Sequence, residues 1–211
     1  MIRPESFSKF SQIDAGFCNA KESLELKNPI LMKKVHSAYV LVLTETPAEP
    51  PQCDALVTRT PGLKLTIKTA DCAPVLFIDP VANVIGAAHA GWKGAFQGVL
   101  ENTILTMLKL GATIDHIRAA IGPHLTQKSF QVAADMQNLF PKTEQHFFAS
   151  RETGSYFDFT GYIQHRLQRA SIQTIDSYPI DTFSDPAYNS YRREAESHAR
   201  QYSFIQLTKG A

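Results

Sequence analysis

One cysteine and one histidine in residues 66–94, TIKTADCAPVLFIDPVANVIGAAHAGWKG, have residue types that could do chemistry. Cys72 follows Asp71 just before an apolar run, and His89 ends the next apolar run, at the start of a glycine-rich sequence. With His36 upstream, they offer one thiol and two imidazoles. A catalytic zinc site takes three such protein ligands and leaves the fourth position for water or substrate. We therefore regard His36, Cys72 and His89 as candidate metal ligands.

Packing alone could also account for these residues. Free cysteine is among the most frequently buried side chains, so Cys72 could be a small apolar residue ahead of the sequence APVLF. The sequence HAGWKG, which begins at His89, could be a plain turn between a strand and a helix, with glycines that serve only the backbone geometry. The spacing matches no compact CxxC motif. The sequence leaves packing and chemistry both open.

The residues after His89 could bind an anion. The first turn of a helix offers free N–H groups and the positive end of the helix dipole, and Lys93 would add a cation there. A lysine at such a turn can also be simply hydrated. Trp92, the only tryptophan, could stack on a ring or cover the core. The sequence GWKGAF lacks the G-x-x-x-x-G-K-[ST] pattern of a P-loop.

The apolar pattern predicts strands that would position the candidate ligands. The predicted strands are residues 39–43, 55–57, 63–69, 75–78, 84–89, 117–121 and 202–207. The sequence DPVAN opens a turn between the fourth and fifth strands, and its shortness predicts a hairpin. Cys72 and His89 would then lie near the same end of that hairpin.

Helical and irregular segments complete this interpretation. Residues 95–110 have apolar side chains at helical spacing and are followed by Gly111, which predicts a helix. Two further amphipathic segments follow at 129–139 and 160–170. Residues 176–200 are rich in proline and charge, which indicates irregular structure. We see no repeat or linker.

The composition is that of an ordinary globular protein. Of 211 residues, 44% are hydrophobic and 19% are charged, and the formal net charge of +1 gives no electrostatic signature of nucleic-acid binding. The length fits a single domain over residues 1–211. We see no apolar leader and no run of about 18 apolar residues, and three cysteines are too few for a disulfide framework. We therefore expect a cytoplasmic protein without a membrane or nucleic-acid partner.

The remaining histidines do not indicate a second metal centre. They are His116, His124, His146, His165 and His198, and none forms an H-x-H pair or an H-E-x-x-H sequence. His124, directly after IGP, is a candidate neighbour of the first site.

Several longer segments resemble the YfiH-like family. They are VHSAYV, CDALVTRTPGLKLTIKTADCAPVLF, AAHAGWKGAFQGVLENTI, AAIGP and YNSYRREAESHARQYSFIQL, which together cover most of the chain. The motifs TADCxPVL and HAGWxG are specific when they occur together in this order. The resemblance implies an α+β fold, a mixed β-sandwich flanked by helices in four layers (α/β/β/α). It also implies that His36, Cys72 and His89 match the family's three metal ligands, usually read as zinc.

The same resemblance implies an enzyme of purine nucleoside metabolism. The family was first named for polyphenol oxidase (laccase) activity and is now described as purine nucleoside phosphorylase, with adenosine deaminase and methylthioadenosine phosphorylase activities. This chain departs from the family pattern at several places. Lys93 stands where an arginine is usual, KVHS replaces QVHG, and HAR replaces TGR ending at Arg200. The family's N-terminal SLNLGxHVGD block is reduced to FCNAKESLELKN.

The leading hypothesis is therefore a zinc-dependent phosphorylase of adenosine, inosine, guanosine or methylthioadenosine, with copper as another possible metal. The metal and nearby cations would stabilise charge that develops on phosphate or ribose. Lys93, Arg192 and Arg200 are the candidate contacts to phosphate or substrate. The same metal could support adenosine deamination, for which Asp71 is the carboxylate nearest to Cys72 in sequence.

Three alternatives stay open at this point. Cys72 could be a nucleophile activated by His89 in a hydrolase that acts on an amide, for example in the editing of peptidoglycan precursors. A copper-dependent polyphenol oxidase is disfavoured, because a multicopper cluster needs closely paired histidines. Finally, the metal could be purely structural, with His124 as a fourth ligand that closes the site.

Overall fold

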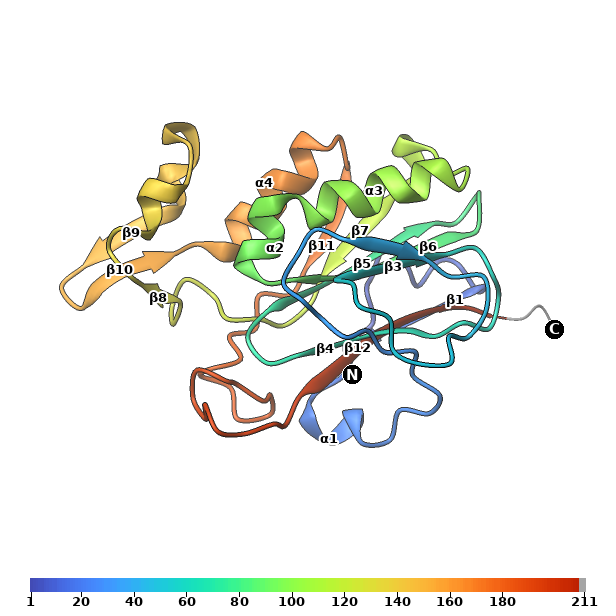
Figure 1. Ribbon diagram of the computed structural model, residues 1–211, viewed down its shortest axis with the longest axis horizontal. Coiled ribbons are helices and arrows are strands. Elements are labelled where there is room, and N and C mark those ends of the chain that lie inside the picture. The colour runs from blue at the N-terminus through green and yellow to red at the C-terminus, as the bar shows by residue number, and fades with distance from the viewer. Residues whose placement is uncertain (209–211) are drawn as a thin grey trace.

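The structure of residues 1–208, a computed structural model, is built around one large sheet (Figure 1). This six-stranded sheet has the order β11-β7-β5-β6-β3-β2. Its strands, in that order, are β11 (Thr174–Ser177), β7 (Arg118–Ile121), β5 (Ala73–Asp79), β6 (Val84–Ala90), β3 (Ala55–Thr58) and β2 (Val40–Val42). The outer pairs β11–β7 and β2–β3 are parallel, and the inner pairs are antiparallel. The β5–β6 hairpin thus forms the centre of the sheet.

The central strands are covered on both faces. In β5, Val75 and Phe77 belong to the apolar core on one side of the sheet, whereas Leu76 and Ile78 belong to the core on the other side. Successive side chains of a strand point to opposite faces, so a continuous apolar run is typical of a strand that is buried on both. The sheet therefore separates two hydrophobic cores.

Helices cover one face, and a smaller sheet covers the other (Figure 1). The helices are α2 (Trp92–Gln97), α3 (Val99–Lys109) and α4 (Phe159–Arg169). The smaller sheet is antiparallel and contains β1 (Ile13–Phe17), β12 (Gln201–Leu207) and β4 (Leu65–Thr69), with β12 in the middle. The short helix α1 (Ala20–Ser23) contacts β12 on the outer side. The four layers implied by the family resemblance are confirmed, although the fourth contains only this four-residue helix.

A third, small sheet extends to one side of this body (Figure 1). It has the order β8-β10-β9. Its strands are β8 (Gln131–Val132), β9 (Phe148–Arg151) and β10 (Gly154–Phe157). Two short 3-10 helices, Met136–Leu139 and Lys142–Phe147, lie between β8 and β9. A further 3-10 helix, Ile114–His116, precedes β7 of the large sheet. Within residues 1–208, no helix is long and apolar enough to cross a membrane.

Most predicted elements are present, and two differ. All seven predicted strands occur, and residues 160–170 form α4. The helix predicted at 95–110 is instead two helices, because Gly98 has a left-handed backbone (φ +97°) that ends α2 and precedes α3. Residues 129–139 contain β8 and a 3-10 helix rather than one continuous element. Residues 178–200 contain no helix or strand, as expected for most of the segment 176–200.

Candidate metal centre

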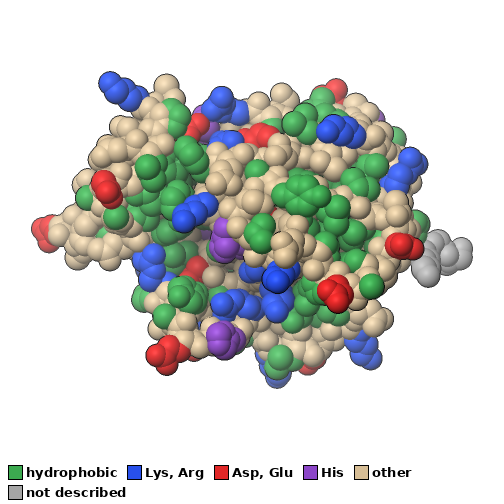
Figure 2. All heavy atoms as spheres, in the orientation of Figure 1, with side chains coloured by type: hydrophobic (Ala, Val, Ile, Leu, Met, Phe, Trp, Pro, Cys, Tyr) green, Lys and Arg blue, Asp and Glu red, His purple; other side chains and the backbone are tan. Residues whose placement is uncertain are grey.

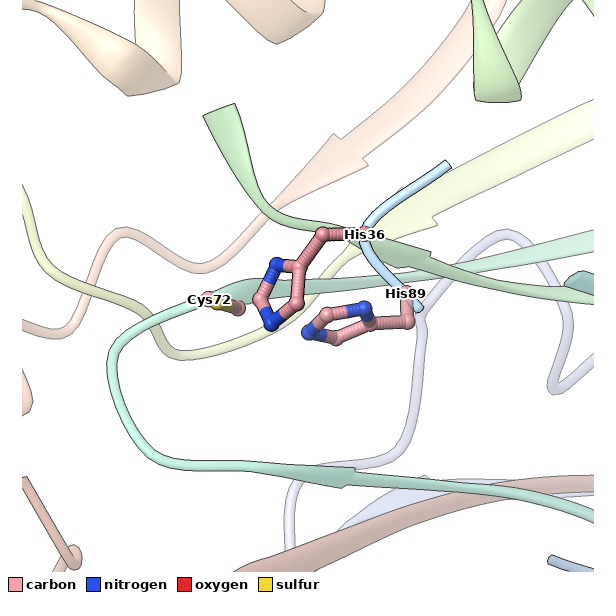
Figure 3. Close-up of side chains that lie close together, drawn as sticks. All are labelled: His36, Cys72 and His89. Atoms are coloured by element: carbon pink, nitrogen blue, oxygen red, sulfur yellow. The ribbon is translucent and has the colours of Figure 1, made fainter. Parts of the chain in front are cut away.

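The three candidate ligands lie together at one end of the central hairpin. Ligand atoms of His36, Cys72 and His89 all lie within 4.8 Å of one another (Figure 3). Cys72 directly precedes β5, and in β6 His89 pairs with Pro74 of β5, so the hairpin register brings these two together as predicted. His36 comes from the loop before β2, and its ring meets that of His89 edge-on, with centroids 5.1 Å apart.

The buried carboxylate of Asp54, directly before β3, holds the His36 loop in place. Its Oδ1 accepts a hydrogen bond from the backbone N–H of His36 at 3.0 Å. Its Oδ2 accepts from the backbone N–H groups of Val35 and Ser37, at 3.2 and 2.7 Å, and from the Ser37 hydroxyl at 3.0 Å. His36 itself has a left-handed backbone (φ +56°), which costs free energy in a residue with a side chain. The hydrogen bonds to Asp54 compensate for this strain.

Asp54 also orients His89. Nδ1 of His89 lies 3.0 Å from Asp54 Oδ1, and a carboxylate can only accept, so Nδ1 carries the proton and Nε2 keeps its lone pair. Burial would raise the pKa of Asp54, but hydrogen bonds from His89 and Ser37 lower that pKa well below its usual range. The carboxylate is therefore charged at neutral pH, as required of an orienting partner to a metal-bound histidine.

His89 Nε2 is a buried lone pair without a partner. Burial lowers the pKa of His89 to about 4, against the opposing effect of Asp54, so the ring is neutral at pH 7. Nε2 has no hydrogen-bond partner among the described residues. An unsatisfied buried acceptor costs about 1–3 kcal/mol, and a metal ion would satisfy it. The donor set of two imidazoles and a thiol therefore fits a metal such as zinc.

The Cys72 thiol is not a ready nucleophile in the metal-free protein. Burial raises its pKa to about 11, although nearby Lys34 acts in the opposite direction. Reactive cysteines have pKa values below that of a free thiol, so this shift has the wrong sign for an activated nucleophile. Coordination would instead deprotonate the thiol, because a metal binds the thiolate.

Gly91 leaves the space that the ligands occupy. A Cβ atom at this position would lie 2.9 Å from His36 Nδ1 and 3.4 Å from Cys72 Sγ. Its backbone angles (φ −75°, ψ 159°) suit any residue, so glycine is needed for space rather than for conformation. This close approach is the specific role of the first glycine in HAGWKG.

A cavity of about 420 Å³ opens beside the ligands. Its lining includes the ligands His36 and Cys72, the aromatic side chains Trp92, Phe130, Phe159 and Tyr191, and the cations Lys34, Arg192 and Arg200. In Figure 2, a histidine lies in a hollow at the centre of the face shown, with Lys and Arg side chains around it. The cavity is thus lined by two candidate metal ligands together with aromatic rings and cations.

Two of the three predicted cationic contacts line this cavity. The Arg192 guanidinium donates to the carbonyl oxygens of Gln131 and Ser129, at 3.0 and 3.5 Å, and lies over the Phe130 ring. Arg200 donates to the carbonyl oxygens of Ser197 and Ala199, at 2.9 and 2.6 Å.

Lys93 does not line the cavity. It is exposed, with Nζ 5.6 Å from the centroid of the Trp92 ring. The turn at HAGWKG therefore contributes Trp92, rather than Lys93, to the cavity wall.

His124 does not join the ligand group. It is fully buried, its Nδ1 donates to the Gly122 carbonyl oxygen at 2.7 Å, and its Nε2 accepts from the Thr160 hydroxyl at 2.8 Å. Both ring nitrogens are therefore occupied. No other His, Cys, Asp or Glu of residues 1–208 belongs to the group of three. Three protein ligands without a fourth are typical of a catalytic rather than a structural zinc site.

Asp71 connects the ligand segment to the irregular segment near the C-terminal end. Its Oδ1 accepts from the Thr182 hydroxyl at 2.7 Å, and its Oδ2 accepts from the Arg192 backbone N–H at 2.6 Å. The residue has a left-handed backbone (φ +81°) directly before Cys72. Asp71 thereby fixes Arg192 relative to the metal ligands.

Sequence reasoning missed two residues of the site, Asp54 and Lys34. The signal for Asp54 was a single carboxylate ahead of the apolar run ALV. Lys34 is half-buried in the cavity wall, and its Nζ donates to the Lys68 carbonyl oxygen at 2.7 Å. Burial lowers the pKa of Lys34. In the sequence it is one member of a lysine pair, which gives no sign of burial.

Comparison with known proteins identifies the family. The family model described as multi-copper polyphenol oxidoreductase laccase matches residues 11–208. A Deinococcus radiodurans protein named purine nucleoside phosphorylase is 38% identical over 158 residues, which is 74% of this chain and 62% of that protein's length. A Corynebacterium glutamicum protein with the same name is 34% identical over 186 residues, 86% of this chain and 75% of the relative.

Solved structures agree with this result. A crystal structure of a Neisseria meningitidis protein has a TM-score of 0.79 and 28% identity, and the match covers 90% of this chain and 78% of the other. The YfiH protein of Bacillus licheniformis has a TM-score of 0.84 over 97% of this chain and 95% of the other, and at 24% identity this likeness concerns the fold. From the match over residues 11–208 and these relatives, the chain belongs to the YfiH-like family, described by its model as multi-copper polyphenol oxidoreductase laccase.

Proposed function

We propose that this chain is a purine nucleoside phosphorylase that binds zinc through His36, Cys72 and His89. The observation that carries the proposal is the position of this ligand group in the wall of a cavity that also contains cations and aromatic rings. The relatives from D. radiodurans and C. glutamicum are named purine nucleoside phosphorylase, which supports the reaction class. Adenosine, inosine, guanosine and methylthioadenosine are the candidate substrates.

The aromatic side chains of the cavity would bind the purine. Trp92, Phe130 and Tyr191 offer flat apolar faces, with the buried Phe159 ring behind them, and stacking of a base on such faces contributes about 1–3 kcal/mol per base. Phe130 is itself held by edge contacts to Phe157 and Phe159, with centroids 5.7 and 5.6 Å apart. The purine would therefore meet at least one ring, that of Phe130, whose position is fixed by packing.

The cations of the cavity would bind the attacking phosphate. Backbone carbonyl groups hold the side chains of Arg192, Arg200 and Lys34. Because these partners are neutral, they orient each cation before the substrate arrives without neutralising its charge. When bound, zinc would supply a Lewis acid that stabilises negative charge on a substrate oxygen. Asp54 would keep His89 in the tautomer that coordinates.

The test combines metal analysis with a nucleoside assay. We expect about one zinc per chain and release of adenine from adenosine only when phosphate is present. Cys72→Ala should lose both zinc and activity, whereas Cys18→Ala, which removes a buried thiol far in sequence from the ligands, should keep both. Inosine in the same assay would indicate that the metal site also deaminates adenosine. Formation of neither adenine nor inosine would exclude both purine reactions.

One observation favours a second candidate, a cysteine hydrolase. The Asp54–His89 pair beside Cys72 has the order of groups found in nucleophile–histidine–carboxylate triads. The raised pKa of Cys72 argues against it. Hydrolysis of an amide substrate at full rate after removal of metal by a chelator, together with rapid alkylation of Cys72, would favour this candidate over the metal site. Phenol oxidation that strictly requires added copper would favour the oxidase named in the family description.

A further inference from the structure

A second cavity lies beside the first and is lined by basic side chains. It encloses about 450 Å³ and shares Arg200 with the first cavity. Its other basic lining residues are Lys21, Lys68 and His198. No Asp or Glu belongs to the lining. The charged groups of the lining are therefore all basic, and they lie among neutral residues such as Ala20, Leu24 and Asn189.

Three separate parts of the chain bring these groups together. Lys21 lies in α1, Lys68 in β4, and His198 and Arg200 in the segment directly before β12. In the small sheet, Lys68 pairs with Tyr202, which also lines the second cavity. Lys34 of the first cavity donates to the Lys68 carbonyl oxygen at 2.7 Å, so the two cavities share a wall. The basic surface is thus continuous from one cavity to the other.

The basic side chains of the second cavity form no ion pair in the part of the chain that the structure describes. Other cations, such as Arg3 and Arg166, form ion pairs with Asp14 and Glu101. No carboxylate of residues 1–208 forms an ion pair with Lys21, Lys68 or Arg200. Like charges that converge in a concave surface repel one another and attract anions. Bound phosphate would relieve this repulsion.

We propose that the second cavity is a phosphate subsite that continues the proposed active site through Arg200. The phosphate group would be either free inorganic phosphate or the ester phosphate of a nucleotide whose purine lies in the first cavity. This inference rests on the proposed function insofar as it assigns the purine to the first cavity. The subsite extends the substrate class from nucleosides to phosphorylated nucleosides, or provides the entry position of the attacking phosphate.

Calorimetric titration of the zinc-loaded protein tests the subsite with three probes: adenosine, adenosine 5′-monophosphate and inorganic phosphate. The variant is Lys21→Gln combined with Lys68→Gln, which removes two charges and leaves Arg200 in place. The matched control is Lys9→Gln combined with Lys27→Gln, because both lysines are exposed and line neither cavity. If the ester phosphate binds there, the monophosphate should bind about tenfold more tightly than adenosine, as one charge-assisted hydrogen bond allows. The Lys21/Lys68 variant should lose this difference and leave adenosine binding unchanged.

The other outcomes are equally distinct. If free phosphate is the ligand, adenosine and its monophosphate should bind alike, and the Lys21/Lys68 variant should weaken phosphate binding about tenfold relative to the control. If the variant binds the monophosphate and phosphate as tightly as the control does, the subsite is refuted. Adenine release, measured on the same samples, separates this failure from that of the proposed function. No adenine from the unmodified protein, together with phosphate binding that depends on the two lysines, would refute the phosphorylase and keep the subsite.

Discussion

A single carboxylate, that of Asp54, connects two of the three candidate metal ligands. It accepts from the backbone of His36 and from the ring of His89, and both contacts measure 3.0 Å. One group therefore sets both the position of the exposed ligand and the tautomer of the buried one. Loss of an outer partner of this kind typically lowers metal affinity about 10- to 100-fold.

We expect Asp54→Asn to weaken zinc binding about 10- to 100-fold. The amide keeps the shape of the carboxylate, but its NH₂ group cannot accept, so either His89 or the His36 loop loses its partner. Competition with a chromophoric zinc chelator measures the Kd. Asp115→Asn, at an exposed position outside the site, is the control. An unchanged Kd for Asp54→Asn would show that the carboxylate does not orient the ligands.

The lowered pKa of His89 makes the stability of the metal-free protein depend on pH. The folded-state pKa of about 4 lies below the usual value of 6.5, so between these values the unfolded chain binds the extra proton. The contribution of His89 to the free energy of unfolding is therefore fully present above pH 6.5 and is lost as the pH falls toward 4. This loss amounts to about 3 kcal/mol at most. The lowered pKa of Asp54 acts in the same direction, but only below the usual pKa of an aspartate, about 3.9.

Urea unfolding of the chelator-treated protein at pH 7 and pH 4.5 measures this effect. His89→Gln lacks the titrating ring, so its unfolding free energy should change less between the two pH values than that of the unmodified protein. His116→Gln, at an exposed position, should behave like the unmodified protein. Equal pH dependence of the unfolding free energy in all three proteins would contradict the assignment of this dependence to His89.

At the scale of elements, two glycines border the short helix α2 and have different roles. Gly91, between β6 and α2, leaves space for His36 and Cys72 while its own backbone is unstrained. Gly98, between α2 and α3, has φ +97°, and a Cβ there would make only ordinary contacts at 3.6 and 3.8 Å. Gly91 is therefore needed for the space around the ligands, and Gly98 for the change of chain direction between α2 and α3.

This difference predicts opposite effects of two alanine substitutions. Gly91→Ala should reduce the zinc content after dialysis and change the unfolding free energy of the metal-free protein little. Gly98→Ala should keep the zinc content and lower the unfolding free energy by about 1 kcal/mol or more, because alanine is strained at positive φ. Each variant is the control for the other. If both variants lose stability and keep zinc, the role assigned to Gly91 is wrong.

At the scale of the whole molecule, the features that contiguous sequence patterns encode were predicted better than those that depend on contacts between distant parts of the chain. The apolar runs and the DPVAN turn are contiguous, so the β5–β6 hairpin, and with it the juxtaposition of Cys72 and His89, followed from the sequence. Helical spacing continues across Gly98, so periodicity alone could not reveal the break. The short strand β1 has no clear alternation and was not predicted.

The parts of the site that sequence could not predict depend on contacts across the chain. Asp54 meets residues 35–37 only after the loop before β2 folds back over β3, and no local pattern encodes that contact. Lys34 becomes part of the cavity because the small sheet supplies the carbonyl of Lys68. Lys93 was expected near the substrate from its position in HAGWKG, and the helical turn directs it to the surface instead.

The position of Trp92 has a practical consequence. It is the only tryptophan in the 211 residues, and it lines the first cavity. The indole fluorescence of this protein therefore arises from one place, beside the candidate ligands and under the ammonium group of Lys93. The unlabelled chain thus carries an optical reporter whose signal comes from the cavity wall alone.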